Sequence, residues 1–137
     1  MKASYKILVN FLAVITGLAI AIAFLVSSIL SRVPDVSKRS PSGDYRIESV
    51  PASSLFTPRD AVYLRFTDLR DPDRIYRTPL FSDISLDMQT EEGHSTVGII
   101  FIQFNKESRH FTLALPNPRE HWLDFVVSNT PYKVLEN

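Results

Sequence analysis

The longest apolar stretch of the chain runs from Ile7 to Leu30, and the nearest charged residues on either side are Lys6 and Arg32. As a helix rising about 1.5 Å per residue, the stretch measures about 36 Å, which exceeds the ~30 Å of hydrocarbon in a bilayer. Apolar residues occupy every face of this helix, whereas a surface helix of a soluble protein has one apolar stripe. The pattern predicts a transmembrane helix over residues 7–30, preceded by a cytoplasmic tail at residues 1–6.

Two other interpretations of the apolar stretch stay open. One is a buried helix of a soluble protein, although such helices are usually shorter. The other is a cleavable signal peptide, because residues 1–6 form a short basic region and Ala21-Ile22-Ala23 has the small residues of a cleavage site. The apolar run continues past that point, and it is longer than the ~7–15 apolar residues of a typical signal peptide. These features favour an uncleaved anchor.

The orientation of the span follows less directly from the charges. Lys6 directly abuts the apolar run, which favours a cytoplasmic N-terminus and an outer C-terminal region. Positive charges on the two sides nearly balance, so the inverse topology stays open. Residues 31–42 (SRVPDVSKRSPS) are rich in serine, proline and basic residues, a composition that builds no core. We expect a linker there, followed by a folded domain over residues 43–137.

The pattern of the folded domain is dominated by alternation with period two, which predicts strands. In Ala61–Leu69, for example, Val62, Leu64 and Phe66 fall on one face. Val97–Phe104 is apolar on both faces, which favours a single central strand. The expected strands are Tyr45–Val50, Ala61–Leu69, Ile75–Phe81, Ser82–Gln89, Val97–Phe104 and His110–Leu115. We expect the intervening segments, including 51–58, 71–73, 90–95 and 106–109, to form turns or loops.

Near the C-terminus the period changes to that of a helix. Asn117 and Pro118 are typical of a helix start, and Asn129 and Pro131 are typical of its end. Trp122, Phe125 and Val126 form one apolar stripe at helical spacing, so we expect the helix to pack these side chains on a sheet. The expected fold is α+β or mostly β: a transmembrane helix, then a small antiparallel sheet domain with one C-terminal helix.

Composition excludes several classes of function. The chain carries 15 Lys+Arg and 15 Asp+Glu, and most of the acidic residues lie after residue 42, so the folded domain is acidic and nucleic acid is not expected as a partner. The chain has no cysteine, which excludes disulfides, zinc–thiolate sites and cysteine nucleophiles. It has four glycines and no phosphate-binding glycine loop. We expect no cofactor, no metal and no small-molecule substrate.

The side chains suited to catalysis or metal binding form no recognisable motif. His94, His110 and His121 are too far apart in sequence to be a short-range ligand pair. A hydrolytic triple of Ser53 or Ser54 with His94 and Asp83 can be written down, but domains of this size generally offer such triples. Asp68, Asp71 and Asp73 lie at a hairpin tip where calcium is conceivable, but Arg70 and Arg74 alternate with them and favour local ion pairs. We therefore expect no enzymatic activity.

Charged residues on strands and turns are the better candidates, and they indicate a protein partner. Arginines on a rigid sheet suit the carboxylates of a partner, although pairing within the domain with Asp60, Asp68 or Asp83 is the simpler interpretation. The candidate partner-binding residues are Arg65, Arg77, Asp68, Asp71, Asp73, Glu91 and Glu92. Within the span, small residues four apart allow close packing with another helix, and these are Ala13, Gly17 and Ala21.

One stretch carries a resemblance to a known group. The span is followed by Ser40-Pro41-Ser42-Gly43-Asp44-Tyr45-Arg46, and Tyr63-Leu64-Arg65-Phe66 follows later. This arrangement resembles small enterobacterial single-pass membrane proteins, in which one N-terminal span leads into a Ser-Pro-x-Gly-x-Tyr-Arg strand and a compact β-rich domain. The resemblance implies an inner-membrane anchor and a periplasmic domain, and it implies no catalytic residues.

Three functions remain as hypotheses. The first is a membrane-anchored, non-enzymatic protein-binding module, whose sharpest form is an immunity protein against a secreted toxin that acts in the periplasm. The second is an accessory subunit of a cell-envelope complex that packs through its transmembrane helix. The third, a small hydrolase, is the least favoured.

Overall fold

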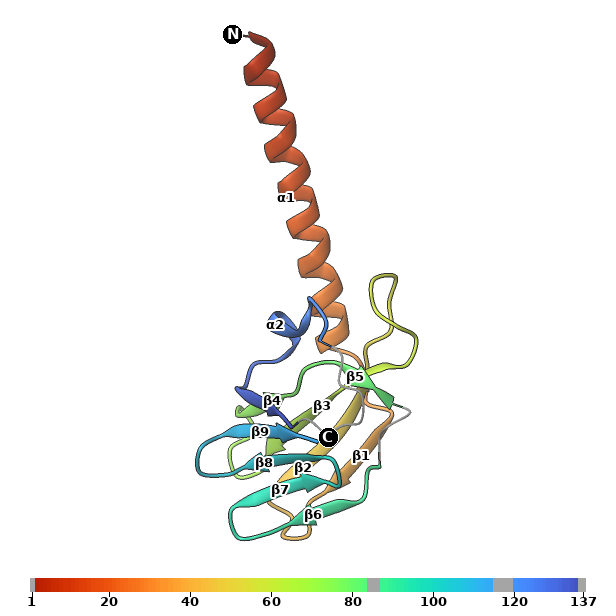
Figure 1. Cartoon of the computed structure of the whole chain (residues 1–137), viewed down its shortest axis with the longest axis vertical. Helices are drawn as coiled ribbons and strands as arrows, with labels where there is room; N and C mark the ends of the chain where they lie inside the picture. Colours follow the sequence, from red (N-terminus) through yellow and green to blue (C-terminus); the bar gives the residue numbers. More distant parts are fainter. Residues whose placement is uncertain (1, 84–86, 115–119, 136–137) are drawn as a thin grey trace. The chain divides into compact units, whose positions relative to one another are not determined.

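The computed structural model describes residues 2–83, 87–114 and 120–135, and the chain divides into two compact units. The first unit, Met1–Ser31, consists of helix α1, Lys2–Leu30 (Figure 1). This helix is long and apolar enough to cross a membrane, a property that it shares with signal sequences near an N-terminus. It begins earlier than the predicted span, because residues 2–6 continue the same helix.

The second unit, Arg32–Asn137, contains two five-stranded sheets. In the first sheet the order is β1-β2-β3-β4, and β5 also pairs with β3. Its strands are β1 Val36–Arg39, β2 Tyr45–Pro51, β3 Ala61–Asp68, β4 Ile75–Arg77 and β5 Phe81–Ser82. The second sheet has the order β10-β9-β8-β7-β6. Its strands are β6 Thr90–Glu92, β7 Thr96–Ile99, β8 Ile102–Asn105, β9 His110–Leu113 and β10 Tyr132–Val134.

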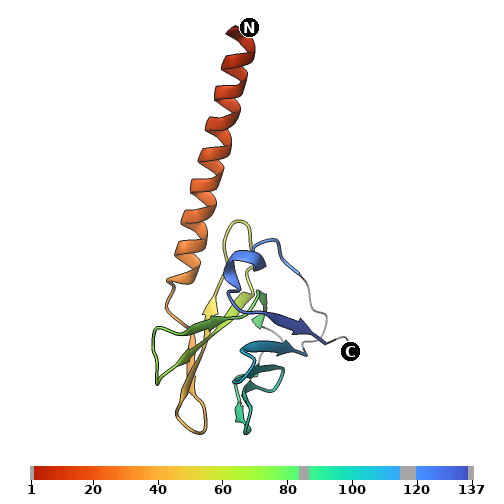
Figure 2. The same ribbon diagram turned by 90° about the vertical axis from the view of Figure 1, so that its left-hand side faces the viewer.

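The core of this unit lies between the two sheets, which face each other in Figure 2. Inward-facing residues of β2 and β3 pack against those of β7, β8 and β9. Aromatic rings connect the layers: Phe66 of the first sheet lies 5.1 Å from Phe111 and 5.9 Å from Phe104 of the second sheet, measured between ring centroids. Rings at these separations add to the stabilisation that burial alone provides. The prediction of one sheet covered by a helix is therefore replaced by two sheets that cover each other.

Strands with clear alternation were predicted close to their observed bounds. β2, β3 and β9 start at the expected residues Tyr45, Ala61 and His110. The expected strand Ile75–Phe81 is present but interrupted. Thr78 fills the gap, because its Oγ1 accepts a hydrogen bond from the Leu64 backbone N–H at 2.9 Å while its own N–H donates to the Leu64 carbonyl at 3.0 Å.

The expected central strand Val97–Phe104 is wrong, because this stretch forms the hairpin β7–β8. Ile99 pairs with Ile102 across a turn at Ile100 and Phe101. Gly98 makes the hairpin possible, since a Cβ atom at this position would lie 2.1 Å from the carbonyl oxygen of Ile102. The stretch has apolar residues on both predicted faces because each strand buries its own residues in the core, namely Val97 and Ile99 on β7 and Ile102 and Phe104 on β8.

Three other segments differ from the sequence predictions. Val36–Arg39, inside the expected linker at residues 31–42, form edge strand β1 and pair with β2. Thr90–Glu92, expected in a turn, form edge strand β6. β10 was not expected, and it is parallel to β9 rather than antiparallel. Natural sheets often have short edge strands with charged side chains, so such strands carry little hydrophobic pattern.

The C-terminal helix is shorter than expected. α2 covers Asp124–Val127 only; Asp124 and Val127 are buried within it, and Leu123 is buried just before it. The predicted stripe is wrong in phase, since Trp122 and Phe125 are exposed. Residues 84–86 of the expected strand Ser82–Gln89, and the predicted helix start at Asn117 and Pro118, lie outside the described residues.

Candidate functional site

The second unit has two opposite ends, which we name the distal end and the entry end. β2 separates them, and its seven residues span about 20 Å at the usual rise of ~3.3 Å per residue. The distal end consists of the turns at 40–44, 69–74, 93–95 and 106–109. The entry end lies at Pro51, whose carbonyl accepts a hydrogen bond from the Arg32 guanidinium at 3.2 Å, where the chain enters the unit.

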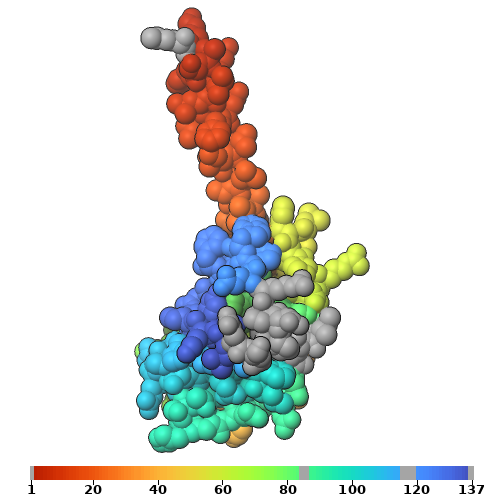
Figure 3. Space-filling model, in the orientation of Figure 1, coloured from red at the N-terminus to blue at the C-terminus, as the bar shows by residue number. Residues whose placement is uncertain are grey.

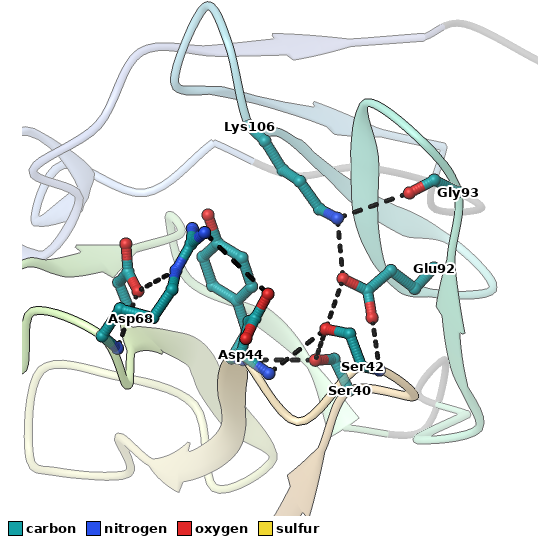
Figure 4. A network of polar contacts seen from close by, with 9 residues as sticks. Ser40, Ser42, Asp44, Asp68, Glu92, Gly93 and Lys106 are labelled. Carbon is teal, nitrogen blue, oxygen red and sulfur yellow. Dashed lines mark hydrogen bonds and ion pairs between the residues drawn. The ribbon is translucent and has the colours of Figure 1, made fainter.

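A polar network centred on Glu92 holds the distal end together (Figure 4). Lys106 Nζ lies 2.7 Å from Glu92 Oε2, and the backbone N–H of Ser42 donates to Oε1 at 2.7 Å. The Ser42 hydroxyl donates to Oε2 at 2.9 Å. Burial alone would raise the pKa of the Glu92 carboxyl, but the hydrogen bonds from Lys106 and Ser42 outweigh burial and lower the pKa to about 2. Glu92 therefore ties the first sheet to the second as a carboxylate.

The predicted residues of the β3–β4 hairpin also lie at the distal end. Asp68 Oδ1 accepts hydrogen bonds from the backbone and side chain of Arg70, and Arg74 Nε lies 3.1 Å from Asp71 Oδ2. These are the local ion pairs that the alternation of arginine and aspartate favours. Asp71 keeps half of its side-chain surface exposed, and Asp73 is also exposed.

The two predicted arginines are held inside the domain. Arg65 and Arg77 lie opposite each other on β3 and β4. Arg65 Nε lies 3.1 Å from Glu48 Oε1, with both side chains largely buried, so its partner is not one of the expected aspartates. Arg77 Nε donates to the Val127 carbonyl at 2.8 Å, which fixes α2 to the first sheet. Burial lowers the pKa of the Arg77 guanidinium.

The acidic and basic predictions therefore separate by role. Arg65, Arg77, Asp68 and Glu92 have partners within the domain and are at least partly buried. Asp71 pairs with Arg74 but stays half exposed, and Asp73 and Glu91 are exposed. Glu91 is the exposed neighbour on β6 of Glu92, whose side chain is only 6% exposed. The exposed carboxylates at the distal end are the part of the predicted set that a partner can reach.

A shallow hollow of about 590 Å³ beside α2 brings together a histidine, a carboxylate and a serine, namely His121, Asp124 and Ser128. Their polar atoms already serve the fold. Asp124 accepts hydrogen bonds from the backbone N–H groups of Leu80 and His121, and the Ser128 hydroxyl donates to the Thr130 carbonyl at 3.0 Å. His121 Nδ1 accepts a hydrogen bond from the Leu123 backbone N–H at 3.1 Å, so this ring nitrogen is also engaged by the fold. No serine–histidine hydrogen bond forms in this hollow among the described residues.

The other histidines gather no catalytic constellation either. The His110 ring contacts the Ser108 hydroxyl in an exposed turn, where no carboxylate is bonded to either side chain among the residues described. His94 lies in another distal turn, far along the chain from Ser54, whose hydroxyl pairs with Thr57 at 2.7 Å. Across residues 2–83, 87–114 and 120–135, no three His, Asp or Glu side chains are grouped to hold a metal ion.

The entry end carries an exposed apolar surface that the sequence analysis missed. We name it the apolar tip, and its members are Val33, Leu55, Phe56, Trp122 and Phe125. Leu55 and Phe56 lie in the middle of the predicted loop between Pro51 and Pro58, a place where an apolar pair is unusual. This apolar pair within a loop is the sequence feature from which the exposed surface could have been predicted.

In the first unit, Ala13, Gly17 and Ala21 all lie on α1. A Cβ atom at Gly17 would meet nothing within 4 Å.

Comparison with known proteins identifies no relative: no protein-family model, curated protein or solved structure matches the chain.

Proposed function

We propose that this protein is a membrane-anchored, non-enzymatic protein-binding module of the bacterial inner membrane. α1 is the anchor, the N-terminus is cytoplasmic and the two-sheet unit lies in the periplasm. The observation that carries the proposal is α1 itself, a helix of 29 residues without a charge between Lys6 and its end at Leu30. Placing such a helix in water exposes apolar surface along its whole length, whereas lipid accommodates every face.

The distal end is the proposed contact surface for the partner. Asp71 and Asp73 are exposed in turn 69–74, which its own ion pairs and the Leu69 N–H bond to the Asp44 carbonyl hold, and Glu91 is exposed on β6 beside the Glu92 network. Ordering a flexible surface on binding costs free energy, so a braced surface binds at a smaller entropic cost. A basic protein surface is the complementary partner. The most specific form of the proposal is an immunity protein that covers the basic site of a toxin acting in the periplasm.

The test is a crosslinked pull-down from detergent-solubilised membranes with the triple variant Asp71→Lys/Asp73→Lys/Glu91→Lys. We expect it to lose a co-purifying protein that the wild-type chain retains, because the exposed carboxylates become like charges. Asp83→Lys, a single exposed charge reversal outside the distal turns, is the control for position and should retain that protein. Equal recovery with the triple variant would overturn the distal end as the contact surface.

The immunity role has a cellular test of its own. Cells that lack the gene should become sensitive to neighbouring toxin-bearing cells, and expression of the full chain should restore resistance. Unchanged sensitivity in the deletion strain would count against the immunity role while leaving the pull-down result in place.

An accessory subunit that packs through its span is the second candidate. Ala13, Gly17 and Ala21 repeat every four residues and lie on one face of α1, where small side chains let a second helix approach closely. Replacing all three by leucine should release a co-purifying membrane protein. Retention of that protein would remove this candidate.

A further inference from the structure

The most exposed apolar residues of the second unit lie at its entry end. Among its described residues, all five members of the apolar tip are at least 50% exposed, with Leu55 at 97% and Phe125 at 76%. The remaining exposed large hydrophobic residues, Val36, Ile75, Ile100 and Leu135, are less than 40% exposed. Single exposed apolar side chains are ordinary, but a group of the most exposed ones at one end marks an interaction surface.

The loop of the tip is built to present its apolar pair outward. Ser54 and Thr57 form an isolated bridge, and their hydroxyls lie 2.7 Å apart. The backbone N–H of Phe56 donates to the Ser54 hydroxyl at 3.2 Å. Leu55 and Phe56 are therefore the two central residues of a braced turn, where glycine, asparagine or aspartate is usual. Exposing leucine and phenylalanine to water at this position is unfavourable, which indicates that the pair serves an interaction.

His121 joins this loop to the segment that carries the other two aromatic residues. Its Nε2 lies 3.1 Å from the Phe56 carbonyl oxygen and donates to it, while its Nδ1 accepts from the Leu123 backbone N–H. Trp122 follows directly, and its ring stacks on the His121 ring at 5.7 Å between centroids. Figures 1 and 2 show loop 52–60 and α2 at the same end of the two sheets, and the space-filling view in Figure 3 shows the loop projecting from the surface.

The chain itself determines what lies near this end. The Arg32 guanidinium donates a hydrogen bond to the carbonyl of Pro51, the residue just before the loop. Val33 is the next residue of the chain after Arg32. Only Ser31 separates Arg32 from the end of α1 at Leu30. If α1 is in lipid, this covalent connection keeps the entry end within a few residues of the membrane surface. Arg32 and exposed Arg59 add positive charge, which anionic headgroups attract.

We propose that the apolar tip inserts into the interface of the same membrane that α1 spans, so that the unit sits on the lipid with its distal end outward. A membrane interface suits the side chains of the apolar tip, because tryptophan and phenylalanine favour the headgroup level and leucine favours the acyl boundary. The inference rests on the proposed membrane anchor and adds a second, peripheral attachment. It also gives the distal carboxylates a fixed orientation toward a partner.

The chain contains one tryptophan, Trp122, so its fluorescence reports on the tip alone. The full chain is reconstituted into vesicles of phosphatidylcholine and phosphatidylglycerol whose acyl chains are brominated either near the headgroup or near the bilayer centre. We expect the shallow bromines to quench Trp122 strongly and the deep bromines to quench it less. Acrylamide in the water should quench Trp122 less than it quenches an exposed indole.

The variant Leu55→Ser/Phe125→Ser tests the surface, and its fold should survive because both side chains are exposed. We expect it to lose the lipid quenching and to gain acrylamide quenching. Ile75→Ser, on β4 and outside the tip, is the matched control and should behave as the wild-type chain does. Circular dichroism of each variant shows whether the sheets are retained.

Flotation of the same vesicles after an alkaline wash separates this inference from the proposed anchor. A chain that fails to float refutes the anchor. A chain that floats while Trp122 escapes quenching by both lipids refutes insertion of the tip and leaves the anchor standing. In that second case the apolar tip is free to bind a protein.

Discussion

Replacing Glu92 by glutamine should destabilise the two-sheet unit, because this residue connects the sheets at the distal end. Its side chain is 6% exposed and receives hydrogen bonds from Lys106 and from both the backbone and hydroxyl of Ser42. An unperturbed glutamate has a pKa of about 4.3, so a folded value of about 2 corresponds to about 3 kcal/mol of stabilisation at neutral pH. Glutamine keeps an acceptor for Ser42 but removes the charge that Lys106 requires, so we expect a loss of about 2–3 kcal/mol.

The same residue predicts a pH dependence. Because folding lowers the pKa of Glu92, its stabilisation is fully present above the unfolded value of about 4.3 and is lost as the pH falls through the folded value of about 2. The wild-type unit should therefore lose about 3 kcal/mol more than Glu92→Gln between about pH 5 and pH 2. The two proteins should approach the same stability at the acidic end.

Urea unfolding of the full chain in detergent micelles, followed by far-ultraviolet circular dichroism, measures both effects. A loss of 2–3 kcal/mol lowers the midpoint by about 1–2 M urea at the usual dependence for small proteins. Glu91→Gln, the exposed neighbour on β6, removes the same charge and should stay within about 0.5 kcal/mol of wild type. Equal midpoints for Glu92→Gln and Glu91→Gln at neutral pH would refute the structural role of the network.

Two further substitutions test the fold. Gly98→Ala should cost about 3 kcal/mol of stability or prevent folding, since its Cβ would lie 2.1 Å from the Ile102 carbonyl oxygen. Thermal unfolding measures this cost, with Gly93→Ala as the control because the nearest atom to its Cβ is 3.4 Å away. A Gly98→Ala protein as stable as Gly93→Ala would contradict the hairpin. Asp124→Ala should cost about 2–4 kcal/mol by removing the acceptor of the buried Leu80 N–H, with α2 losing amide-exchange protection; unchanged protection near α2 would contradict that role.

Strand positions were predictable where apolar and polar residues alternate in the sequence. β2, β3 and β9 begin where this alternation begins, although only β9 keeps one face less buried, whereas β2 and β3 bury most residues of both faces. Periodicity failed at Val97–Phe104, where two short strands each turn inward-facing residues to the core. A continuous apolar run has the same pattern in one buried strand as in a tight hairpin, and only the close approach at Gly98 distinguishes them.

Helical periodicity failed at the C-terminal segment for a related reason. Trp122 and Phe125 have helical spacing, but so do Leu123 and Val127, which are the pair that the fold buries. In a helix as short as α2, packing rather than the pattern decides which face is buried. The edge strands β1 and β6 were also missed, because their side chains are mostly polar and their pairing is decided by the neighbouring strand.

The candidate site was predictable in part. The charges of the β3–β4 hairpin and of β6 were located in turns and strands from sequence, but which of them face solvent depends on pairings far apart in the chain. Glu92 meets Ser42, fifty residues earlier, and Arg65 meets Glu48 on a neighbouring strand. The apolar tip likewise joins Phe56 to His121, sixty-five residues apart, and no local pattern announces that contact.

The location of residues 7–30 in cells is the most direct test of the whole account. Membranes from cells producing the full chain are washed at alkaline pH and treated with protease on the periplasmic side, and the retained protein is sequenced from its N-terminus. We predict an intact N-terminus in the washed membrane fraction, with the two-sheet unit accessible only from the periplasm. A mature protein in the soluble fraction that begins after Ala23 would contradict the anchor, and with it the proposed function and the inserted tip.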